Sequence, residues 1–104
     1  SFEELRRQYP DSNFDLATTK GTHVYTDVQY GKDDFLVFGK ETKGIPEEIL
    51  MQNLDHCIRI PIIDEARSLN LSNSVAIVLF EALRQLDFPG AKLYGKLKQF
   101  EKGD

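Results

Sequence analysis

The stretch that most constrains the fold runs from residue 58 to residue 86 and reads IRIPIIDEARSLNLSNSVAIVLFEALRQL. It begins as a short apolar strand, passes through a loop rich in Ser and Asn, and becomes a helix that is apolar on most of its circumference. Asn70 or Ser72 is the predicted cap, because Ser and Asn side chains accept hydrogen bonds from the free N–H groups of a helix N-terminus. A helix that is apolar nearly all round is covered on more than one side. We therefore expect the helix over 74–86 to lie on a sheet with one face and on a second subunit with the other.

A second unit of strand, loop and helix lies upstream, over residues 35–46, and reads FLVFGKETKGIP. Four consecutive apolar residues predict a strand that is buried on both faces, as in a parallel sheet. A loop bounded by Gly39 and Gly44 follows, and Pro46 suits the first position of a helix. Ligands of open α/β sheets bind at the carboxyl ends of the strands. The two loops therefore mark a candidate ligand site.

The remaining elements follow from periodicity and from turn residues. We expect helices over 2–9 and 46–52, strands over 14–18 and 57–61, and a short edge strand or connector over 23–26. Strands that alternate with helices indicate an α/β fold with a mostly parallel sheet and helices on both faces. A chain of 104 residues allows one domain. We place it over 1–90, followed by a lysine-rich tail over 91–104.

Composition excludes some classes of protein. Hydrophobic residues make up 40% and charged residues 29%, as in globular chains, and the longest apolar run is far shorter than the ~20 residues that span a membrane. The formal net charge of −4 does not favour a nucleic-acid partner, although local basic patches decide such binding. The single cysteine is compatible with a reducing cytoplasm. His23, His56 and Cys57 are too few and too scattered for a metal site.

The segments FGKETKGIP and RIPIIDEARSLNLSNSVAIVLFEALRQ resemble motifs two and three of the SPOUT class of RNA methyltransferases, in its SpoU branch of ribose 2'-O-methyltransferases. The resemblance extends from Phe14 to Gly90 and is strongest to the tRNA wobble-nucleotide (cytidine/uridine) 2'-O-methyltransferases. It implies methyl transfer from S-adenosyl-L-methionine to a ribose 2'-hydroxyl of tRNA. It also implies a cytoplasmic homodimer and a C-terminal trefoil knot whose loops form the cofactor pocket.

The resemblance also assigns site residues. It implies that the cofactor is held by Ala17, Gly39, Ile60 and Ser68, with Thr18, Ile62 and Leu69 as neighbours. Residues that would face the substrate or take part in catalysis are Glu41, Arg67, Ser72 and Asn73.

Each of these residues also has a purely structural interpretation. Gly39 can belong to an ordinary turn at the end of a strand, and Glu41 can be a structural carboxylate. An isolated Arg67 is most often a solvated surface residue, and Ser72 or Asn73 can cap a helix.

Three loop lysines and Arg67 would form a basic rim at the same end of the sheet, suited to phosphate contacts; the lysines are Lys20, Lys40 and Lys43.

The first motif of the family, Pro-x-Asn-x-Gly-Asn-x-x-Arg, does not occur in this sequence. The family members also have a longer N-terminal side, so we expect the chain to be a C-terminal portion that lacks the early strands. The motif arginine is the usual candidate for the general base, which therefore stays unassigned. We expect the 104 residues alone to be inactive. Two alternatives stay open: another RNA substrate, such as ribosomal RNA, or a non-catalytic fragment that dimerises.

Overall fold

The computed structural model describes residues 1–40, 43–63 and 69–97. Within these ranges four strands form one sheet in the order β2-β4-β1-β3, and every pairing is parallel. The elements in chain order are α1 (Phe2–Gln8), β1 (Phe14–Ala17), β2 (His23–Val24), the 3-10 helix η1 (Tyr25–Asp27), β3 (Phe35–Phe38), α2 (Glu47–Gln52), the 3-10 helix η2 (Leu54–His56), β4 (Cys57–Arg59) and α3 (Leu71–Gln85).

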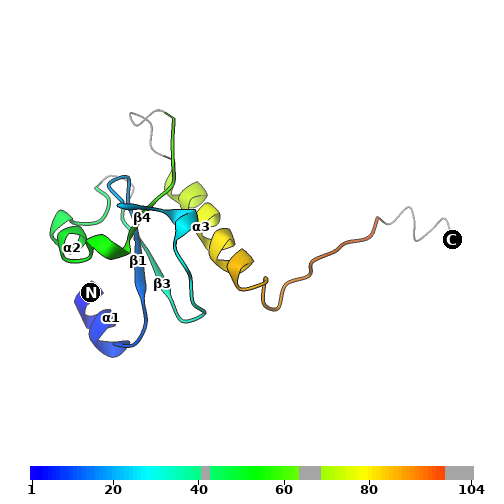
Figure 1. Cartoon of the computed structure of the whole chain (residues 1–104), viewed down its shortest axis with the longest axis horizontal. Helices are drawn as coiled ribbons and strands as arrows, with labels where there is room; N and C mark the ends of the chain where they lie inside the picture. The colour runs from blue at the N-terminus through cyan, green and yellow to red at the C-terminus, as the bar shows by residue number, and fades with distance from the viewer. Residues whose placement is uncertain (41–42, 64–68, 98–104) are drawn as a thin grey trace.

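Helices cover both faces of the sheet, as the sequence predicts (Figure 1). Side chains of a strand point alternately to the two faces. Phe14 and Leu16 of β1 therefore share one face, where they lie in a cluster with Leu50 of α2 and with partly buried residues of α1. On the other face, Ile58 of β4 lies in a cluster with Val78 and Ala82 of α3. The expected α/β architecture is confirmed.

Strand β3 differs from its prediction. Its four apolar residues, Phe35–Phe38, were expected to be buried on both faces, but each is only half-buried. The strand order explains the difference, because β3 lies at the edge of the described sheet and β1 occupies the interior. Phe35 stacks on Phe14 with ring centroids 4.7 Å apart, so its aromatic ring packs against the apolar cluster beneath α1. An apolar run predicted the strand correctly but not its position in the sheet.

Helix α3 begins at Leu71, earlier than predicted, because Asn70 caps it. The Asn70 side-chain oxygen accepts a hydrogen bond of 2.8 Å from the backbone N–H of Asn73. Val78 is buried against the sheet, whereas Leu79 and Phe80 are 39% and 59% exposed. The helix therefore has a second, outward apolar face, as its sequence indicates. None of the helices in the described ranges is long and apolar enough to cross a membrane.

The C-terminus of α3 is closed by two backbone hydrogen bonds from residues with positive φ. The N–H of Phe88 donates to the Leu83 carbonyl (2.8 Å), and the N–H of Asp87 donates to the Arg84 carbonyl (3.1 Å). This is the Schellman pattern, in which glycine normally occupies the left-handed position. Here Asp87 occupies it, with φ 61°. The helix end thus carries backbone strain that a glycine would remove.

Two carboxyl groups, one buried and one half-buried, lie beside the α3 face of the sheet. Asp15 of β1 is 3% exposed, and a hydrogen bond joins its side chain to that of Asp34. Burial, the hydrogen bond and the negative charge of Asp34 raise the pKa of Asp15 to about 7. One oxygen of each carboxyl group has no hydrogen-bond partner among the described residues. A hydrogen bond between two carboxyl groups needs a proton, which Asp15 with its raised pKa can carry.

Gln85 joins α3 to the segment between η1 and β3. Its side-chain oxygen accepts from the backbone N–H of Tyr30 (2.9 Å), and its amide nitrogen donates to the Val28 carbonyl (2.9 Å). The buried Tyr30 hydroxyl in turn donates to the Tyr25 carbonyl (2.7 Å). The Gln85 bonds fix the C-terminal end of α3 to the segment before β3, while the N-terminal end of the helix reaches the site described next.

Candidate functional site

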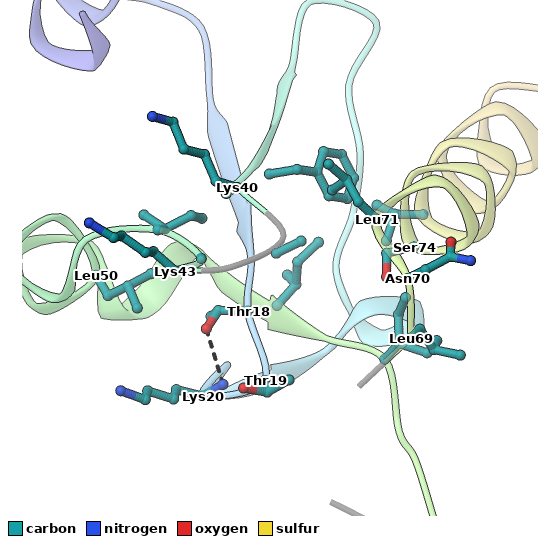
Figure 2. Close-up of a pocket in the computed structure, with 18 of the residues that line it drawn as sticks. Thr18, Thr19, Lys20, Lys40, Lys43, Leu50, Leu69, Asn70, Leu71 and Ser74 are labelled. Atoms are coloured by element: carbon teal, nitrogen blue, oxygen red, sulfur yellow. Dashed lines mark hydrogen bonds between the residues drawn. The ribbon is translucent and has the colours of Figure 1, made fainter. Parts of the chain in front are cut away.

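A pocket of about 520 Å³ lies at the carboxyl ends of β1, β3 and β4 (Figure 2). Three chain segments that are distant in the sequence form its walls: the turn after β1, the loop after β3, and the segment that runs from β4 into α3. The lining residues are Ala17, Thr18, Thr19, Lys20, Phe38, Gly39, Lys40, Lys43, Gly44, Ile45, Leu50, Ile58, Ile60, Ile62, Leu69, Asn70, Leu71, Ser74 and Val78.

The turn after β1 forms the first wall and packs tightly on β4. The backbone N–H of Thr18 donates to the Ile58 carbonyl (2.9 Å), and the Thr18 hydroxyl accepts from the backbone N–H of Lys20 (3.1 Å; Figure 2). A Cβ placed on Gly21 would lie 2.5 Å from the backbone of Ile58, so glycine is required there. The Lys20 ammonium also lies 3.2 Å from a carboxylate oxygen of Glu47, which joins this turn to α2.

The loop after β3 forms the second wall, and its two glycines have different roles. The N–H of Gly44 donates to the Lys40 carbonyl (2.7 Å), which closes the loop. A Cβ on Gly39 would lie only 2.1 Å from the Gly44 carbonyl carbon, whereas a Cβ on Gly44 would meet no atom within 4 Å. Gly44 instead adopts φ +67°, which disfavours other residues. The space beside Gly39 is therefore filled by its own chain, which favours the turn interpretation of this glycine.

The third wall combines aliphatic side chains after β4 with the first turn of α3. Ile60, Ile62 and Leu69 contribute apolar surface. Asn70 and Ser74 contribute polar groups, and Figure 2 shows them close together on the pocket side of the helix. Residues four apart lie on one helix face. That spacing is the signal by which the sequence could have indicated Ser74, which we did not predict.

Six of the seven predicted cofactor-binding residues line the pocket; they are Ala17, Thr18, Gly39, Ile60, Ile62 and Leu69. The seventh, Ser68, lies outside the described residues, as do Glu41 and Arg67. Ser72 and Asn73 are exposed in the first turn of α3, beside the pocket and not among its lining residues. The structure thus gathers six residues of the predicted cofactor set in one place and leaves Ser72 and Asn73 at its border.

Lysine is the only charged residue type among the described residues that line the pocket. Lys20, Lys40 and Lys43 come from two different loops, and Figure 2 shows their long side chains around its mouth. The three lysines of the predicted basic rim therefore lie around one pocket, although the whole chain carries a net charge of −4, and Arg67 lies outside the described residues. Such a rim favours anionic ligands and phosphate groups.

The fold and the pocket together define an α/β domain with a pocket at the carboxyl ends of parallel strands, where open α/β sheets bind their ligands. The chain belongs to the SpoU rRNA methylase family, whose model matches residues 1–80. The chain is 47% identical over 90 residues to the tRNA (cytidine(34)-2'-O)-methyltransferase of Escherichia coli strain K12. The alignment covers 86% of this chain and 57% of that protein. The chain thus spans just over half the length of such relatives.

Two solved structures are similar in fold as well. One, from a study of 2'-OH methylation of C/U34 on tRNA, has a TM-score of 0.76 and 31% identity, and the match covers 84% of this chain and 53% of that one. The other is an AdoMet-bound rRNA methyltransferase from Sinorhizobium meliloti, with a TM-score of 0.68 and 30% identity over 83% of this chain and 33% of that one. The similarity therefore holds for the backbone as well as for the two motifs.

Proposed function

We propose that this protein transfers a methyl group from S-adenosyl-L-methionine to the ribose 2'-hydroxyl of a cytidine or uridine at the wobble position of tRNA. The observation that carries the proposal is the pocket, because both family motifs contribute to it at the carboxyl ends of the strands. The E. coli relative, named for methylation of cytidine 34, supports the choice of substrate. A tRNA substrate makes the cytoplasm the expected compartment.

The pocket suits a nucleoside cofactor. Its volume of about 520 Å³ lies within the ~300–1,000 Å³ range of small-ligand sites. Ile60, Ile62 and Leu69 offer apolar surface to an adenine ring, and Ala17, Thr18 and Gly39 bring backbone from two strand ends to the same space. Ser68 would complete this set. S-adenosyl-L-methionine supplies an electrophilic methyl group, so these residues need only bind and orient it.

The substrate would approach across the lysine rim. Lys40 and Lys43 can attract RNA phosphates, and Ser72 and Asn73 are exposed where a macromolecule can reach them. Glu41 and Arg67 complete the proposed substrate-facing set. A general base must still remove the proton of the ribose hydroxyl, and none of the described lining residues is a histidine or carboxylate that could accept it at neutral pH.

The proposed assembly is a homodimer built on the outward face of α3. The apolar side chains of Leu79 and Phe80 are exposed to water on this face in the single chain. A second copy would remove this surface from water. Within each subunit we propose a catalytic domain over 1–90 with a C-terminal trefoil knot, followed by the tail over 91–104.

Nucleoside analysis tests the proposed activity. The full-length protein would be incubated with S-adenosyl-L-methionine and either unmodified tRNA or ribosomal RNA, and the digested nucleosides would be measured by mass spectrometry. The proposal predicts 2'-O-methylated cytidine or uridine in the tRNA sample alone. Modification of ribosomal RNA instead would favour the other substrate class. A protein that forms dimers, binds no S-adenosyl-L-methionine and yields no methylated nucleoside would favour a non-catalytic role.

A further inference from the structure

The segment that follows α3 has an unusual composition for a surface segment. Residues 91–97 read AKLYGKL, leave the body of the protein as an extended trace (Figure 1), and are all exposed. Tyr94 is 90% exposed, and Leu93 and Leu97 are more than half exposed. The segment carries two lysines and no acidic residue. Large apolar and aromatic side chains held in water in this way indicate a surface that contacts a partner.

The sequence of the segment alternates basic or aromatic residues with leucine or glycine. In an extended chain, successive side chains point to opposite sides. The sequence alternates so that a strand-like conformation would place Lys92, Tyr94 and Lys96 on one side and Leu93 and Leu97 on the other. An aromatic ring flanked by two ammonium groups is the combination that binds single-stranded nucleic acid, because lysines contact phosphates and the ring stacks on a base.

The charge distribution favours a polyanionic partner for this segment. Residues 1–90 contain nine Lys or Arg and fifteen Asp or Glu, whereas residues 91–104 contain four basic and two acidic residues. Outside the lysine rim of the pocket, the tail is thus where positive charge is concentrated. A body with excess negative charge repels RNA, and an arm of opposite sign offsets that repulsion.

We propose that residues 91–97 form an RNA-contacting arm that uses Lys92, Tyr94 and Lys96. This inference rests on the proposed function, since it takes the substrate RNA as the partner. Asn70 and Ser74, at the N-terminal end of α3, line the pocket, and the arm begins beyond the other end of that 15-residue helix. The helix is about 22 Å long at 1.5 Å per residue. The arm therefore contacts RNA away from the reacting nucleotide and contributes to binding rather than to the chemical step.

The test compares variants of the full-length protein. The double variant Lys92→Ala/Lys96→Ala removes two positive charges from the arm, and Arg7→Ala/Lys32→Ala removes two from exposed positions elsewhere. We expect the arm variant to bind tRNA about tenfold or more weakly than the wild type at 50 mM salt. The slope of log Kd against log salt concentration should be smaller by about 1–2, because two phosphate contacts are lost. The control should change neither quantity comparably. In methyl transfer, the arm variant should raise the KM for tRNA and leave kcat unchanged.

Tyr94 separates stacking from general apolar contact. Tyr94→Phe should keep wild-type affinity for tRNA, whereas Tyr94→Leu should weaken it about fivefold or more, because only an aromatic ring stacks on a base. Equal affinity of the arm variants and the wild type would overturn the proposal, even if the wild type methylates tRNA. Lysine-dependent binding to phosphatidylserine vesicles with unchanged tRNA affinity would also overturn it. Binding to tRNA is measured without cofactor, so failure of methyl transfer alone would count against the proposed activity and not against the arm.

Discussion

The two glycines of the loop after β3 permit a test of how the pocket is built. In Gly39→Ala the new Cβ would lie 2.1 Å from the Gly44 carbonyl carbon and 2.2 Å from the Ile45 nitrogen. Both obstacles are backbone atoms, so a rotamer change cannot relieve the contact and the loop has to move. In Gly44→Ala the added Cβ meets no atom within 4 Å, and only the positive φ of +67° opposes it.

The expected magnitudes differ accordingly. Forcing a methyl group into a filled space typically costs about 1–3 kcal/mol, and a rigid backbone obstacle favours the upper end of that range. The left-handed conformation costs an alanine about 1–2 kcal/mol. Since Gly39 lines the pocket, movement of its loop should also lower cofactor affinity. A distortion of 1.4–3 kcal/mol in the binding conformation corresponds to about 10–150-fold in Kd.

The assay pairs urea unfolding with calorimetric titration of S-adenosyl-L-methionine. Both variants should unfold at lower urea concentration than the wild type, whereas Gly39→Ala should show the larger loss of cofactor affinity. A folded Gly39→Ala protein with wild-type affinity would refute the assignment of this loop as a pocket wall. Equal losses of affinity in both variants would show that loop strain, and not the contact at Gly39, determines the effect.

Three further variants test other parts of the structure. Phe80→Glu places a charge on the outward face of α3 and should convert a dimer into monomers in light scattering; an unchanged dimer would move the interface elsewhere. Asp87→Gly removes left-handed strain and should stabilise the protein by about 1 kcal/mol in urea unfolding; unchanged or lower stability would contradict the strain at this helix end. Since the pKa of Asp15 is raised from 3.8 to about 7, its contribution to stability is fully present below about pH 4 and is lost as the pH rises through 7. Between pH 5 and pH 8 the free energy of unfolding should therefore fall by about 2.7 kcal/mol, since about two pH units separate pH 5 from a pKa of about 7 and each unit corresponds to 1.36 kcal/mol. Asp15→Asn should reduce this fall, and an equal fall in the wild type and in Asp15→Asn would exclude the buried-acid assignment.

Local patterns predicted the elements well, because each depends on neighbouring residues. The apolar run Phe35–Phe38 marked β3 at its observed bounds, and Asn70 was one of two predicted caps of α3. The order of the strands depends on contacts between distant residues, so the same run could not show that β3 lies at the edge.

The candidate site also combines features that the sequence predicts with features that depend on contacts between distant residues. The aliphatic residues of the pocket, such as Ile60 and Leu69, were assigned by resemblance to a family, since isoleucine and leucine carry no chemical signal of their own. Ser74 was missed although it lies one helical turn after the predicted cap Asn70. The Asp15–Asp34 pair could not be foreseen either, because it joins β1 to the residue before β3 across the sheet. The tight fit at Gly39 arises because the backbone of Gly44 and Ile45 passes close to it, and no sequence pattern specifies that approach.

Methyl transfer to a synthetic anticodon stem-loop tests the central claim most directly. Two RNAs would be compared with the full-length protein and labelled S-adenosyl-L-methionine, identical except that one carries 2'-deoxyribose at the wobble nucleotide. The proposed function predicts label in the all-ribose RNA and none in the 2'-deoxy RNA, since the accepting hydroxyl is the sole difference between them. Equal labelling of both RNAs, or labelling of neither under conditions in which the protein binds its cofactor, would contradict it.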